Sequence, residues 1–147
     1  MVSALKWEAA STSNTLVSSG ASLSNNTISA ASTAYDNKTN LNTYGWLEFT
    51  GTFSVAPSDT SPTLDIYFSE SADGTNYQDA PLTGGADQGE MHVTSIPIQK
   101  VTSAQRIVVG PVALPPNALK AYADNQTGQT LSSAWTLKLY TNNLEAQ

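Results

Sequence analysis

The sequence predicts an all-β fold, an antiparallel β-sandwich of the jelly-roll type. Apolar residues alternate with polar ones over several short stretches, and clusters of Gly, Pro, Asn and Asp separate these stretches. No stretch shows the 3.6-residue apolar period of a helix of about ten residues. Alternation gives each strand one face for a core and one for solvent, so two such sheets are expected to pack face to face. An immunoglobulin-like sandwich is the alternative.

The 147 residues fit one core, preceded by an extended arm. We expect the Ser-, Thr- and Asn-rich arm over residues 1–35 and the β-sandwich over residues 36–147. From Ala9 to Ala34 the chain has no charged residue, and its larger apolar residues are too sparse for a helical stripe. Short strands, an extended arm or a disordered tail all suit that composition.

The strand pattern is clear from Tyr44 onward. In YGWLEFTGTFSV, residues 44–55, Trp46 is the large apolar residue on the otherwise polar face. TLDIYFSE and WTLKLY repeat the two-residue period. The residues expected to face the core are Leu47, Phe49, Phe53, Val55, Leu64, Ile66, Phe68, Trp135, Leu137 and Leu139.

Three further stretches, EMHVTSIPI, QRIVVGPVAL and LKAYAD, are also expected to be strands. The alternation of the first changes phase around Ser95, which predicts a β-bulge or a bend. Pro97 and Pro111 cannot donate to a ladder, so their strands are expected at sheet edges or strand ends.

The stretch SESADGTNYQD, residues 69–79, fits a hairpin connection better than a calcium loop. A calcium loop needs acids or amides at alternate positions, a Gly at the sixth and a Glu at the twelfth, and the match is fragmentary. Asp73 and Gly74 instead predict a turn with positive φ at the glycine, after which Tyr77 resumes the strand. DNQTGQ predicts a second hairpin turn, with positive φ at Gly128.

No catalytic, cofactor-binding or metal-binding residues are expected. The chain has no cysteine, and His92, its single histidine, lacks a nucleophile elbow of the G-x-S-x-G type and is expected at the surface. Asp65 and Glu70 are expected to be solvated acids rather than a glycosidase pair. Gly84 and Gly85 lack the strand-to-helix context and the lysine of a phosphate-binding loop.

The net charge of −6 comes mainly from an acidic block. Between Lys38 and Lys100 the chain has eight acids and no Lys or Arg, and we expect these acids to face solvent. Six scattered cations do not form the basic stripe that nucleic acid requires, so no nucleic-acid partner is expected. Neither an export signal nor a membrane span is recognised in the sequence, so no membrane partner is expected.

Three stretches taken together resemble small structural proteins of tailed bacteriophages. They are AYDNKTNLNTYGWLEF, LDIYFSESADGTNY and LPPNALKAYADNQTGQTLSSAWTLKLY. The resemblance covers most of the chain from about Tyr35, and none of the three is a catalytic signature. It implies a virion component made in the host cytoplasm, most simply a head decoration (cement) protein on the capsid surface. Its partners would be the major capsid protein and copies of itself in a homotrimer.

Other roles in the virion stay open. A tail-tip module that binds carbohydrate or a receptor would use outward aromatic residues that stack on sugar rings. The candidate interaction residues are Trp7, Tyr44, Trp46 and Tyr140. Burial of Trp46 beneath the arm or in a subunit contact is the simpler structural role. A tail-tube or head-completion component is the third possibility.

Overall fold

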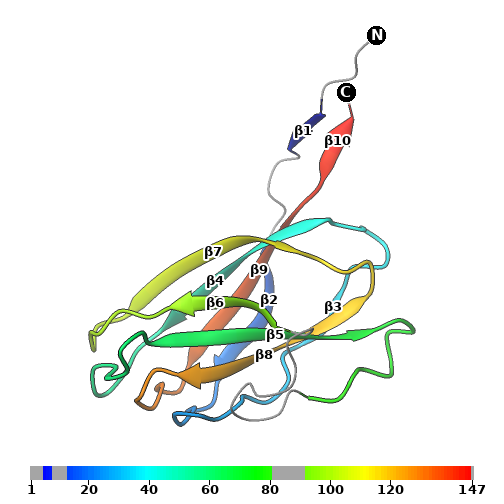
Figure 1. Ribbon diagram of the computed structural model, residues 1–147. Helices are drawn as coiled ribbons and strands as arrows, with labels where there is room; N and C mark the ends of the chain where they lie inside the picture. The colour runs from blue at the N-terminus through cyan, green and yellow to red at the C-terminus, as the bar shows by residue number, and fades with distance from the viewer. Residues whose placement is uncertain (1–4, 8–12, 81–91, 147) are drawn as a thin grey trace.

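The protein is a β-sandwich, as the alternating pattern predicts. The computed structural model describes residues 5–7, 13–80 and 92–146, in which strands form and no helix is present. Two four-stranded antiparallel sheets pack together, and a short two-stranded ribbon extends from one end (Figure 1). Within these residues there is therefore no helix that could span a membrane.

In the described residues, ten strands make up these sheets. They are β1 (Leu5–Trp7), β2 (Asn14–Gly20), β3 (Tyr35–Asp36), β4 (Tyr44–Gly51), β5 (Thr63–Ser71), β6 (His92–Pro97), β7 (Gln105–Ala113), β8 (Ala118–Gln126), β9 (Trp135–Asn142) and β10 (Leu144–Ala146). The first sheet has the order β2-β9-β4-β7 and the second the order β3-β8-β5-β6, while β1 and β10 pair with each other.

The strand pairing is nested along the whole chain. β5 pairs with β6, β4 with β7, β3 with β8, β2 with β9 and β1 with β10. Such nesting describes one long antiparallel hairpin. When the hairpin rolls up, β4 also meets β9 and β5 also meets β8. The resulting eight-stranded order is that of a jelly roll, which confirms the predicted fold class.

The core lies between the two sheets and is built from the apolar face of each strand. Its buried side chains include Leu47, Phe49, Leu64, Ile66, Phe68, Trp135, Leu137 and Leu139, as the alternation predicts. The prediction for Val55 is wrong, since this side chain is 58% exposed. β4 ends at Gly51, and only Phe53 continues inward, through an isolated bridge to Leu131.

The segment expected as an arm is largely part of the sandwich. β2 pairs with β9, and Leu16 and Leu23 belong to the core. Residues 21–34, called the strap below, run from the first sheet to the second and pair irregularly with β8. What extends beyond the sandwich is the ribbon of β1 and β10, in which Leu5–Trp7 pair with Leu144–Ala146 (Figure 1).

Prolines mark two sheet edges, as predicted. Pro97 ends β6 and Pro111 lies in β7, and each of these strands is the last of its sheet. A register shift in β6 between His92 and Thr94 confirms the predicted irregularity, close to Ser95. Gly128 has the expected positive φ of 77°. However, β8 and β9 lie in opposite sheets, so the connection between them is not the hairpin that the sequence suggested.

Candidate interaction face

The open face of the first sheet gathers aromatic and charged side chains that the alternation directs away from the core. This outer face consists of Tyr44, Trp46, Glu48, Arg106, Val108, Lys138, Tyr140 and Asn142. Trp46 on β4 lies directly opposite Tyr140 on β9. Glu48 lies between Lys138 of β9 and Val108 of β7.

A bulge in β7 makes room for the indole of Trp46. The register between β4 and β7 shifts after Gly45, next to Gly110. Gly110 has φ of +148°, and a Cβ there would lie 2.9 Å from Cδ1 of Trp46 and 2.9 Å from the Gly45 carbonyl oxygen. A side chain at residue 110 would therefore collide with both β4 and the indole, and glycine is required on steric and conformational grounds.

Glu48 is the electrostatic centre of the outer face. The Glu48 side chain is buried, with the residue only 4% exposed. Its carboxylate accepts hydrogen bonds from Nε and a terminal nitrogen of Arg106. It also accepts one from the Tyr140 hydroxyl, at 3.3 Å. Nζ of Lys138 lies 3.8 Å from the other oxygen. The hydrogen bonds from Arg106 lower the pKa of Glu48, and burial opposes them only in part.

The side chains around Glu48 form a shallow, open hollow of about 370 Å³. Trp46, Val108 and Tyr140 supply its apolar surface, and Val108 is 51% exposed. Arg106 remains largely exposed although it is paired with Glu48. Trp, Tyr and Arg are the residue types that dominate binding energy in protein interfaces. The outer face therefore contains residue types that are frequent at the centres of protein interfaces.

The four predicted interaction residues are placed as follows. Trp46 and Tyr140 lie together, and Tyr44 precedes Trp46 by two residues on the same face of β4. Trp7 lies on β1 in the terminal ribbon, opposite Leu144, and its side chain is outside the described residues. The structure thus places three of the four residues on the outer face and Trp7 on the ribbon.

The charged part of the face was not predicted. Glu48 belongs to the acidic block of residues 39–99, which was expected to face solvent, and for this residue the expectation is wrong. Arg106 and Lys138 come from strands that flank β4. These cations reach the carboxylate because of the register in which β7 and β9 pair with β4, and a single sequence does not reveal this register.

The other residues considered for chemistry are placed as follows. His92 is exposed, with Nε2 3.3 Å from the hydroxyl of Ser95 and its ring edge-on to Tyr67. Glu70 accepts a hydrogen bond from Asn117. Gly84 and Gly85 lie outside the described residues. In the part of the chain that is described, no three His, Asp or Glu side chains could share a metal ion.

The 69–79 loop is a turn built around Asp73. Its carboxylate accepts hydrogen bonds from the backbone N–H groups of Thr75 and Asn76 at 2.7 and 2.8 Å, which lower the pKa of Asp73, and Gly74 has φ of 82°. The predicted turn is confirmed. The prediction that Tyr77 resumes the strand is wrong, since β5 ends at Ser71 and Tyr77 lies in no strand. Instead, Nζ of Lys120 lies 4.2 Å above the centre of the Tyr77 ring in a cation–π contact.

Calcium is expected to leave the protein's melting temperature unchanged. The lone pairs of Asp73 already accept hydrogen bonds from the turn, so the loop offers no convergent set of ligands. A ligand that binds only the native state must raise the melting temperature. Scanning calorimetry with EDTA and with excess Ca²⁺ measures this, with Mg²⁺ as the ionic-strength control. A calcium-specific rise of several degrees would contradict the turn assignment.

Replacing the buried carboxylate, Glu48→Gln, is expected to destabilise the fold at pH 7 by about 1–3 kcal/mol, because charge-assisted hydrogen bonds become neutral ones. The folded-state pKa of Glu48 is lowered, so its contribution is complete above the ordinary glutamate pKa of about 4.3 and is lost as pH falls through the folded value. Urea unfolding of both proteins from pH 7 to pH 3 should show the two stabilities converging in acid. Glu70→Gln is the matched control, and a difference independent of pH would contradict the role given to Glu48.

No protein-family model, curated protein or solved structure matches this chain. Inferences about its role therefore depend on its own residues.

Proposed function

We propose that this protein is a non-enzymatic structural component of a phage virion, a head decoration protein that attaches to the capsid surface and stabilises it. The outer face carries this proposal. It combines Trp46, Tyr140 and Arg106 around a carboxylate whose charge is neutralised within the protein. Such a face favours attachment through apolar burial and hydrogen bonds rather than through net charge.

The resemblance of three stretches to phage structural proteins supports the same role, and it implies a homotrimer with the major capsid protein as partner. The fold is also suited to this role, since a jelly roll leaves a whole sheet face available while its core is closed. The terminal ribbon of β1 and β10 offers a second point of attachment beyond the sandwich.

Attachment to undecorated phage heads is expected to be only weakly sensitive to salt. Arg106 is satisfied by Glu48, so few ion pairs remain to be screened at a Debye length of roughly 8 Å. Occupancy measured by cosedimentation should change less than tenfold between low salt and roughly 0.5 M salt. A larger loss of occupancy would indicate docking through the acidic residues instead.

Truncation of the central aromatic residue, Trp46→Ala, is expected to weaken head binding about 30-fold, the effect of losing an interface hot spot of about 2 kcal/mol. Val55→Ala is the control, because Val55 is exposed outside the outer face. Circular dichroism should show the fold of both variants intact. Unchanged head binding by Trp46→Ala would exclude the outer face as the attachment surface.

A glycan-binding module of the tail tip is the second candidate, and one observation favours it. Trp46 and Tyr140 lie side by side across β4 and β9, with Arg106 at the rim, which is an arrangement that could stack on a sugar ring and hydrogen-bond its hydroxyls. Binding to isolated host-surface glycans, lost in both Trp46→Ala and Tyr140→Ala, combined with no binding to heads would favour this role.

A further inference from the structure

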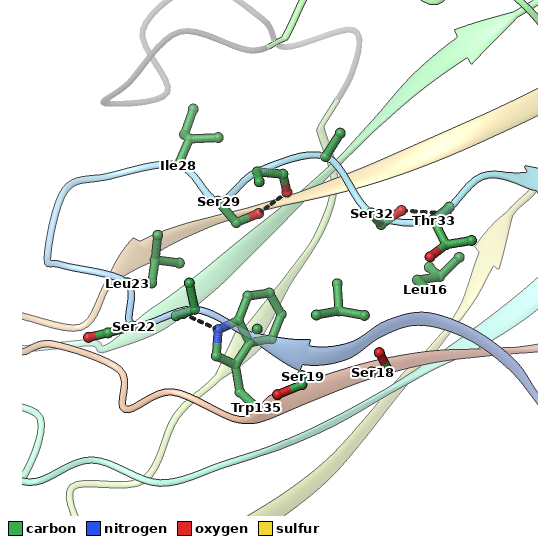
Figure 2. A pocket seen from close by; sticks show the side chains of 15 residues that line it. Leu16, Ser18, Ser19, Ser22, Leu23, Ile28, Ser29, Ser32, Thr33 and Trp135 are labelled. Atoms are coloured by element: carbon green, nitrogen blue, oxygen red, sulfur yellow. Dashed lines mark hydrogen bonds between the residues drawn. The ribbon is translucent and has the colours of Figure 1, made fainter.

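A groove of about 340 Å³ opens on the side of the sandwich between β2 and the strap. Its residues come from Leu16 to Leu23 and from Ile28 to Thr33, with Trp135 from β9. Figure 2 shows the indole of Trp135 beside β2, where its Nε1 donates a hydrogen bond of 2.8 Å to the Ala21 carbonyl. β2 is the edge strand of the first sheet, and β9, β4 and β7 follow it on the side away from the groove.

The strand edge of β2 that does not pair with β9 borders this groove. The Leu16 carbonyl accepts a hydrogen bond of 2.9 Å from the Thr33 N–H, which shows that this edge is directed toward the strap. The register with β9 shifts between Thr15 and Val17 and again between Val17 and Gly20, so Ser18 and Ser19 have no register partner in β9. Ser18 and Ser19 are exposed and lie among the residues that line the groove (Figure 2).

The strap does not fill the groove because its hydrogen bonds are directed to β8. Ser29 and Ser32 each donate a backbone N–H to a β8 carbonyl, at 2.9 Å, and accept a β8 N–H on the side-chain hydroxyl, at 3.0 and 2.8 Å. These four bonds attach the strap to the second sheet. The strap therefore forms the far wall of the groove and leaves the edge of β2 beyond Leu16 open.

β2 is also the least protected of the four sheet edges. β6 and β7 carry Pro97 and Pro111, and β3 has two residues, one of them an aspartate. Prolines, charges and short length are the usual means by which proteins prevent an edge from pairing with another chain. β2 has seven residues, NTLVSSG, with no proline and no charge. Its bulges give some protection, and they limit a new pairing to a few residues.

We propose that this groove binds an extended, uncharged segment of another polypeptide, which adds as a short strand to the free edge of β2. Of the described residues that line the groove, none is charged, so a charged segment would lose hydration there without gaining an ion pair. Backbone hydrogen bonds to β2 would give affinity, and contact with the apolar floor at Trp135 would select a small apolar side chain. The inference does not depend on attachment to phage heads.

A titration of the full-length, ¹⁵N-labelled protein tests this proposal. The probe is an acetylated and amidated peptide with the sequence of residues 14–20, which is uncharged and free of proline, added to about 1 mM. We expect amide shifts confined to residues 17–23 and 28–33 and to Trp135, which line the groove. The same peptide with proline in place of the serine corresponding to Ser18 should bind at least threefold more weakly, because it lacks a backbone donor.

A pair of protein variants gives the matched control. Ala31→Lys places a charge on the wall of the groove and should weaken binding at least threefold, whereas Ala104→Lys, in an exposed loop, should not. Any of four results would overturn the proposal: no shifts at about 1 mM, equal binding of the proline peptide, shifts at β6 or β7, or shifts along β9 beyond Trp135, which would report displacement of β2 itself.

Discussion

Deletion of residues 1–35 is expected to leave a chain that does not fold. The deletion removes β2, which covers one edge of the first sheet, together with the strap that covers the edge of β8. It also removes Leu16 and Leu23 from the core, at about 2–5 kcal/mol for each lost side chain. Because domains of this size are stable by about 5–15 kcal/mol, these losses together reach the whole stability.

Circular dichroism and urea unfolding measure this outcome directly. The control is a shorter deletion, of residues 1–12, which removes β1 but leaves β2, the strap and the core intact, and which should still unfold cooperatively. If the protein without residues 1–35 shows a native spectrum and a cooperative transition, then the strap and β2 contribute to assembly only, and the boundary at residue 35 would mark a true domain limit.

The difference between the expected arm and the observed strands has a physical cause. β4, β5 and β9 bury every second side chain, so their pattern is visible in a single sequence. β2 is a bulged edge strand, and its exposed serines break the alternation. The strap is held by serine hydroxyls that replace backbone groups in pairing with β8. Neither the bulged edge strand nor the serine-bonded strap shows a periodic pattern of apolar residues in the sequence.

The outer face was predictable to the same limited degree. Trp46 interrupts a polar alternation, which is a local property and was therefore found. The pairing of Glu48 with Arg106 joins residues that are 58 positions apart, and it requires the nested order in which β4 lies between β9 and β7. Local patterns predict which face a residue occupies, but the neighbours on that face depend on the strand order.

Asn125 shows how strongly the polar residues of this chain contribute to its stability. The residue is fully buried, and its side-chain amide donates hydrogen bonds of 2.8 Å to the carbonyls of Leu23 and Gln129. Its Oδ1 accepts the backbone N–H and the hydroxyl of Thr127, at 3.2 and 2.7 Å. The backbone of Asn125 bonds to the strap as well, through Asn26 and Thr27. Both donors and both acceptor sites of this amide are therefore used. One bond goes to the strap and three go to the turn that follows β8.

The substitution Asn125→Ala is expected to destabilise the protein by about 3–5 kcal/mol, since it leaves several buried donors and acceptors unsatisfied and opens a cavity. For a chain of this length the melting temperature should fall by about 10–15 °C. Asn40→Ala, in an exposed turn, is the control and should change it by less than about 2 °C.

Asn125→Asp tests the cause. It keeps the shape of the side chain but replaces its two donors with an oxygen that faces two carbonyls, so the loss at pH 7 should be at least as large as for alanine. Burial raises the pKa of such a carboxyl, and its protonated form regains one donor, so the deficit of Asn125→Asp relative to the native protein should shrink as pH falls below that raised value. Urea unfolding at pH 7 and pH 4 measures the change. A deficit for Asn125→Asp that is the same at both values, or smaller than 1 kcal/mol at pH 7, would show that the four side-chain bonds of Asn125 contribute little to stability.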